Sequence, residues 1–123
     1  MHRRSLLLIA GALVLISSSR GLAQSAVGIA AAVHNCQNSD LAPEARIEAC
    51  TQIIHANLAS HGILAAFYYN RAVAYEAARD SDHAKQDYEK ALDLKPDFAE
   101  AKENLARLSG ETPANAPPPV EVH

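Results

Sequence analysis

Residues 66–96 read AFYYNRAVAYEAARDSDHAKQDYEKALDLKP, and this stretch decides the fold of the chain. Its apolar residues recur every three or four positions in two blocks, which is the spacing of one face of a helix. Between the blocks, Asp80, Ser81 and Asp82 are residue types that cap the start of a helix through a side-chain oxygen. Pro96 ends the second block because proline cannot continue helical hydrogen bonding. The pattern therefore predicts a helix, a polar turn and a second helix.

Small residues lie where two such helices would cross. Ala72 and Ala84 would let the two backbones approach closely, and Tyr75 and Tyr88 would fill the space beside them. This arrangement resembles a tetratricopeptide repeat, a helix–turn–helix unit of about 34 residues. With Ala65 as the first position, the residues that match the family pattern are Tyr68, Ala72, Tyr75, Ala84, Tyr88, Ala91 and Pro96.

Three residues depart from the family pattern. Arg71 stands where leucine is usual, Arg79 where glycine usually ends the first helix, and Ser81 where an aromatic residue is common. A Cβ atom at a left-handed position costs about 1 kcal/mol, which puts the tightness of the turn at Arg79 in question. The resemblance implies an all-α fold, a fragment of an α-solenoid made of short antiparallel helix–turn–helix repeats.

The composition of the 123-residue chain suits one small domain of short helices. It contains no tryptophan, only 2 phenylalanines and many alanines, which favours close-packed helices over a sheet. The formal net charge of −3 provides no basic field, so we expect no nucleic-acid partner.

Residues 1–23 resemble a secretory signal peptide. They combine a basic start at 2–4, an apolar run over 6–16 and a small-residue cleavage site at 21–23. The run is shorter than the ~20 residues of a comfortable membrane span. The alternative is an uncleaved membrane anchor, which Arg20 directly after the run supports. We therefore expect a periplasmic or secreted protein exported by a Gram-negative bacterium.

Residues 25–57 are expected to form a degenerate first repeat. Cys50 aligns with Tyr88 at an offset of 38 residues, so the connection over 58–64 carries about four extra residues. Arg46 then occupies the position of a small residue, which weakens the match. The two helices of this repeat are predicted over 25–37 and 42–57.

The helical domain, residues 24–108, is predicted to end with a capping helix over 99–108 that follows the intact repeat over 65–98. Such a helix covers the open end of a repeat stack. The apolar stripe that it shares with the preceding residue is Phe98, Ala101, Leu105 and Leu108. Residues 109–123 are rich in proline and predict a disordered or polyproline tail. Fewer than three full repeats is marginal, so a disulfide or self-association is needed for stability.

Cys36 and Cys50 are the only cysteines. They would lie near the end of one helix and midway along its partner, and in an oxidising compartment such a pair predicts a disulfide. Closing a loop of this length is worth about 3 kcal/mol in the chain-entropy model. The alternative, a redox-active or metal-binding pair, is disfavoured because the spacing is not CxxC and no histidine stands at zinc-finger distance.

No group of residues forms a catalytic or metal-binding motif. The histidines are not spaced as HxxxH or HExxH. Those of the expected domain are His34, His55, His61 and His83. We interpret Asp80, Asp82 and Asp87 as cap and solvent-face residues rather than as acid–base groups, and His83 as a solvated surface residue. We therefore expect no enzymatic activity, no cofactor and no metal.

The resemblance implies that the first helix of the repeat lines a concave surface for a peptide or partner helix. The positions that would face this groove are Ala66, Tyr69, Asn70, Val73 and Glu76. Tyr69 offers contact area with a polar tip, and Asn70 an amide for a peptide backbone. The alternative is that Tyr69 packs against the preceding unit. Some family members capture acidic C-termini with a clamp of lysine, asparagine and arginine; only Asn70 matches it, so carboxylate capture is not expected.

The resulting hypothesis is a periplasmic, non-catalytic protein–protein interaction module that binds a peptide or partner helix. The alternative is a structural subunit that self-assembles as a homo-oligomer through its first repeat, or an envelope-assembly factor held at the membrane by an uncleaved segment. A small enzyme or metal binder is a third hypothesis. The partner itself is not identified by the sequence.

Overall fold

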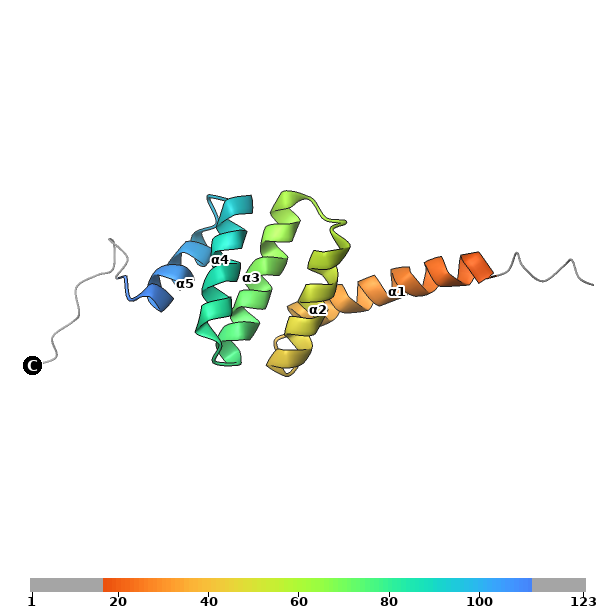
Figure 1. Cartoon of the computed structure of the whole chain (residues 1–123), viewed down its shortest axis with the longest axis horizontal. Helices are drawn as coiled ribbons and strands as arrows, with labels where there is room; N and C mark the ends of the chain where they lie inside the picture. The colour runs from red at the N-terminus through yellow and green to blue at the C-terminus, as the bar shows by residue number, and fades with distance from the viewer. Residues whose placement is uncertain (1–16, 112–123) are drawn as a thin grey trace, which may run out of the picture.

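The computed structural model describes residues 17–111, with side chains from residue 26 onward. Five helices follow one another in this part of the chain: α1 Ser17–Gln37, α2 Pro43–Ala56, α3 His61–Ala77, α4 Ser81–Leu94 and α5 Ala99–Ser109. Helices α2, α3 and α4 lie side by side, and α5 packs at the opposite end from α2 (Figure 1). Residues 17–111 contain no strand, which agrees with the predicted all-α fold. The predictions for residues 1–16 and 112–123 lie outside the described residues.

The turn between α3 and α4 closes α3 with a Schellman motif. The backbone N–H of Asp80 donates to the Tyr75 carbonyl, and that of Arg79 to the Glu76 carbonyl, both at 2.9 Å. Arg79 adopts a left-handed φ of 62°, the conformation that glycine supplies most easily. Asp80 then caps α4 by accepting a hydrogen bond from the His83 backbone N–H at 3.2 Å. The turn is therefore tight although its left-handed position is an arginine. The backbone strain of the turn lies at Arg79.

The core consists of two clusters that share α3. The first joins α1, α2 and α3, and its buried members are Ala32, Cys36, Ala49, Cys50, Ile53, Ile54, Leu64 and Phe67. The second joins α3, α4 and α5, and its buried members are Ala65, Ala72, Ala84, Tyr88, Ala91 and Ala101. Ala72 and Ala84 are fully buried in the same cluster, as expected of residues at a close helix crossing.

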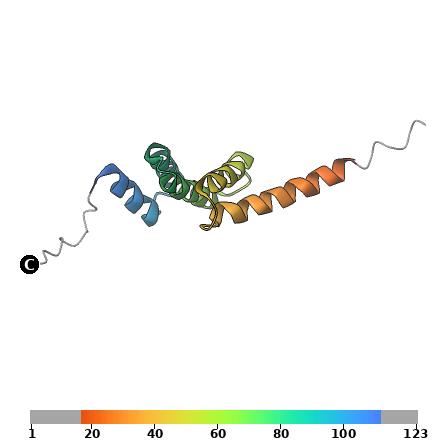
Figure 2. The same ribbon diagram turned by 90° about the horizontal axis from the view of Figure 1, so that it is seen from below.

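Helix α1 departs from the predicted antiparallel stack. Its C-terminal part, around Ala32 and Cys36, packs in the first cluster, while its N-terminal half projects away from the other helices (Figures 1 and 2). Arg46, only 8% exposed, lies on the buried face of α2 one turn before Cys50. The same position is Ala84 in the second repeat.

Two helices begin earlier than predicted. Helix α3 starts at His61, so the last four residues of the predicted 58–64 connection form its first turn, with Ser60 at the N-cap. Helix α1 starts at Ser17 and therefore continues through the predicted cleavage site at 21–23. None of the described helices has the length and apolar character needed to span a membrane.

Candidate partner-binding surface

The residues predicted to face a partner lie along α3, where it runs beside α4 and α5. All five are half-buried: Ala66, Tyr69, Asn70, Val73 and Glu76. They are therefore neither core residues nor fully solvated ones, and the contacts of each decide what it can offer to another molecule.

Tyr69 packs against the helix that follows the repeat. Its ring centroid lies 5.0 Å from that of Phe98 and 5.6 Å from that of Tyr88. The side-chain amide of Asn104 on α5 donates to the Tyr69 hydroxyl at 3.4 Å. The alternative that Tyr69 packs against the preceding unit is thus wrong, because Phe98 and Asn104 hold the ring toward α5.

Glu76 connects α3 to both following helices. Its carboxylate accepts a hydrogen bond from the Tyr88 hydroxyl and another from Arg107, each at 2.6 Å. Asn104 also donates to the Tyr88 hydroxyl, at 3.1 Å. Burial, and then the hydrogen bond to Glu76, raise the pKa of Tyr88, and the Glu76 carboxylate raises the pKa of Arg107. Glu76 is therefore paired within the domain, and its hydrogen bonds link α3 to both α4 and α5.

The other three residues make fewer polar contacts. Val73 packs against the second core cluster. Ala66 has no polar side-chain group, and within residues 26–111 the Asn70 amide forms no side-chain hydrogen bond.

Comparison with protein families identifies the α3–α4 unit. Residues 65–98 match the family model of the tetratricopeptide repeat. The chain carries a tetratricopeptide repeat. No curated protein and no solved structure matches the chain in the corresponding comparisons. The match has the boundaries that the alanine and tyrosine spacing predicted, and this family suggests a module for protein–protein interaction.

A buried ion pair ties the tetratricopeptide repeat to α2, and the sequence analysis missed it. Arg71 donates to both carboxylate oxygens of Asp87 at 2.7 and 2.8 Å, and to the Thr51 hydroxyl at 3.0 Å. Only 15% of the Arg71 side chain and 8% of the Asp87 side chain are exposed. The prediction that Asp87 faces solvent is wrong, because Arg71 pairs with it between the helices. The sequence contained an indication of this pair, because an arginine at a usually buried leucine position requires an acidic partner nearby.

At the turn of the tetratricopeptide repeat, His83 remains exposed but is not free in solvent. Its Nδ1 lies 2.6 Å from a carboxylate oxygen of Asp80, and its ring stacks on Tyr75 at 5.0 Å. The side-chain hydrogen bond with His83 lowers the pKa of Asp80. The predicted N-cap role of Asp80 is confirmed, and the histidine reinforces it.

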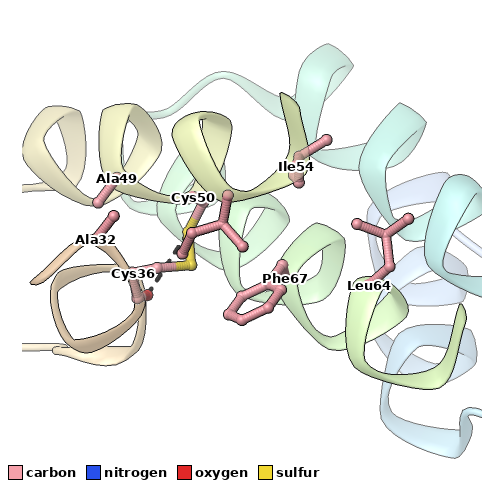
Figure 3. Close-up of a cluster of buried hydrophobic side chains, with 8 residues drawn as sticks. Ala32, Cys36, Ala49, Cys50, Ile54, Leu64 and Phe67 are labelled. Atoms are coloured by element: carbon pink, nitrogen blue, oxygen red, sulfur yellow. Dashed lines mark hydrogen bonds between the residues drawn. A yellow bond between two sulfur atoms is a disulfide. The ribbon is translucent and has the colours of Figure 1, made fainter. Parts of the chain in front are cut away.

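A disulfide joins Cys36 at the end of α1 to Cys50 in the middle of α2, as predicted (Figure 3). The two Cα atoms are 4.7 Å apart, and both side chains are fully buried. Ala32, Ala49 and Phe67 belong to the same cluster. This bond anchors the part of α1 that touches the rest of the domain.

The described residues contain no candidate metal centre, because no group of three or more His, Cys, Asp or Glu side chains comes close enough to hold an ion.

Proposed function

We propose that the chain is an exported, non-catalytic module that binds a peptide or partner helix through the α3 face of its tetratricopeptide repeat. One observation carries this proposal: residues 65–98 match a repeat family of interaction modules. In such repeats, function resides in a surface that accepts another polypeptide rather than in a reactive group.

Two kinds of residue have different roles in this proposal. Asn70 and Ala66 contact the partner, with the Asn70 amide pairing to a peptide backbone group. Tyr69 and Glu76 position α5 beside them through Phe98 and Arg107. Since Tyr69 is half-buried, its remaining exposed edge adds contact area at low entropic cost.

Export is the second part of the proposal. Residues 1–23 have the basic start, apolar run and small-residue site of a signal peptide. The buried disulfide supports an oxidising compartment, because such bonds are kept reduced in most cytosols. N-terminal sequencing of protein recovered from a Gram-negative periplasm tests it: a start near residue 24 supports cleavage, and an intact Met1 contradicts it.

Binding is tested with peptides selected from a random library on the oxidised full chain. We expect Asn70→Ala and Ala66→Arg to weaken a selected peptide at least about fivefold in calorimetry, the loss of roughly 1 kcal/mol. Gln86→Ala, at an exposed position of α4, is the control and should bind as the parent does. Binding that is equally strong in all three variants would place the partner on another face.

A further inference from the structure

Helix α5 places a second row of side chains beside the α3 face that the proposed function assigns to a partner. Asn104 of α5 donates to the Tyr69 hydroxyl at 3.4 Å, and Arg107 donates to the Glu76 carboxylate at 2.6 Å. The later residue of α5 meets the later residue of α3, so the two helices run in the same direction (Figure 1). The side of α5 that carries Asn104 and Arg107 therefore adjoins the partner-facing side of α3.

Two glutamates share that side of α5. Glu100 precedes Asn104 by four residues and Glu103 precedes Arg107 by four, and helical residues at this spacing lie on one face. Both glutamates are exposed, and within residues 26–111 neither carboxylate forms a salt bridge. Because the helices are parallel, the two glutamates lie beside the part of α3 that contains Ala66. We define the α3–α5 face as Ala66, Tyr69, Asn70, Glu100 and Glu103.

Nearby basic residues do not balance the negative charge of the α3–α5 face. The lysines and arginines of α3 and α5 are Arg71, Lys102 and Arg107. Arg71 is held between α3 and α4 by its ion pair, and Lys102 lies one and two residues from the two glutamates, spacings at which helical side chains do not face each other. A hydrogen bond with Glu76, and to a smaller extent the charge of Glu103, raise the pKa of Arg107. Three carboxylates, at positions 76, 100 and 103, and one guanidinium leave two negative charges uncompensated.

The free carboxylates lie beside a free amide. Within residues 26–111 the Asn70 amide forms no side-chain hydrogen bond, whereas Glu76 and Arg107 already pair with each other at 2.6 Å. Neighbouring helices pack about 8–10 Å apart, a span that a long basic side chain and a glutamate can bridge together. A peptide whose backbone pairs with Asn70 on α3 thus meets Glu100 and Glu103 on α5 with its side chains.

We propose that the α3–α5 face selects a basic segment of another protein, with a lysine or arginine of that segment paired to Glu100 and Glu103. This inference rests on the proposed function, which supplies a polypeptide ligand, and adds the chemistry of that ligand. The chain itself is a poor source of such a segment. Its formal net charge is −3, and residues 112–123, which follow α5 in the sequence, contain Glu121 and no lysine or arginine. A partner rich in carboxylates would be repelled by the same two glutamates.

The composition of the peptides selected from the random library on the oxidised full chain gives the first test. Lysine and arginine together should be at least about twice as frequent in the selected peptides as in the input library. A parallel selection on Glu100→Gln combined with Glu103→Gln should still yield peptides, but without this excess. All residues of the α3–α5 face follow the expected cleavage site at 21–23, so export does not remove any of them.

Calorimetry with one selected lysine- or arginine-containing peptide gives the second test. The variant Glu100→Gln with Glu103→Gln should bind it at least about threefold more weakly at low salt, because each exposed ion pair is individually weak. The difference should shrink at roughly 0.5 M salt, where surface charges are screened. The matched control is Glu89→Gln with Asp93→Asn, two exposed positions of α4 that change the net charge equally; it should bind as the parent does. Circular dichroism verifies that both variants keep the fold.

The outcomes separate this proposal from the one on which it rests. Peptides whose binding depends on Asn70 but which carry no excess of lysine and arginine would overturn the basic-segment proposal alone. Equal weakening by the α4 control, or no weakening by the α5 variant, would do the same. A selection that yields no peptide sensitive to Asn70→Ala would overturn the proposed function, and with it this inference.

Discussion

Replacing Arg71 with leucine, the residue that the repeat family favours there, should destabilise this protein. In Arg71→Leu the Asp87 carboxylate, 8% exposed, loses two charge-assisted hydrogen bonds of 2.7 and 2.8 Å, and Thr51 loses its donor. Removing one partner of a buried pair typically costs 3–5 kcal/mol, because the other charge stays buried. As 15% of the Arg71 side chain is exposed and water can enter there, we expect about 3 kcal/mol.

The assay is urea unfolding of the oxidised protein, followed by circular dichroism. In a companion thermal melt, a loss of about 3 kcal/mol corresponds to a fall in Tm of roughly 12–24 °C for a domain of this size. Arg71→Leu combined with Asp87→Leu should recover most of the loss, since apolar residues replace buried ion pairs at little cost. The reasoning is refuted if Arg71→Leu alone costs under about 1 kcal/mol, or if the double variant is as unstable as the sum of the single ones.

Three further predictions concern stability. Arg79→Gly should stabilise the domain by about 1 kcal/mol in the same urea assay, because the residue has a φ of 62°; a neutral or destabilising result would show that the turn is unstrained. Cys36→Ala with Cys50→Ala should cost about 3 kcal/mol, given the sequence separation of 14 residues, and equal midpoints for the oxidised and reduced parent would contradict this. The pKa of Asp80 is lowered in the folded state by its hydrogen bond with His83. Its contribution to stability is therefore present above the ordinary pKa of 3.8 and is lost as the pH falls through the lower folded value. In Asp80→Asn, the free energy of unfolding should fall less steeply between neutral and acid pH than in the parent. The same pH dependence in both proteins would contradict a stabilising role of the Asp80 charge.

The repeat could be predicted because its information is local. Ala72 and Ala84 are small at the crossing, Tyr88 fills the space beside them, and all three are fully buried. The spacing of such residues in one stretch is enough to define a helix–turn–helix unit. The cysteine pair was equally accessible, because the helical positions of Cys36 and Cys50 place them on facing sides.

The errors arose where a residue's environment depends on another helix. Asp87 looks like a surface residue within α4, and only Arg71, 16 positions earlier, makes it a buried one. The first turn of α3 was assigned to the connection because the repeat was counted from Ala65, while the helix itself begins at His61. Helical periodicity likewise does not reveal that α1 projects from the stack (Figure 1) or that Arg46 lies on the buried face of α2.

The way α3 is shared has a consequence for how the molecule comes apart. Leu64 and Phe67 belong to one cluster and Ala65 and Ala72 to the other, while Tyr68 and Leu94 lie against both. Unfolding of either cluster would remove side chains of α3 against which the other cluster packs. The two clusters should therefore unfold together rather than one after the other. Calorimetry should show a single endotherm, and amide protons in α2 and α4 should exchange through one common opening event.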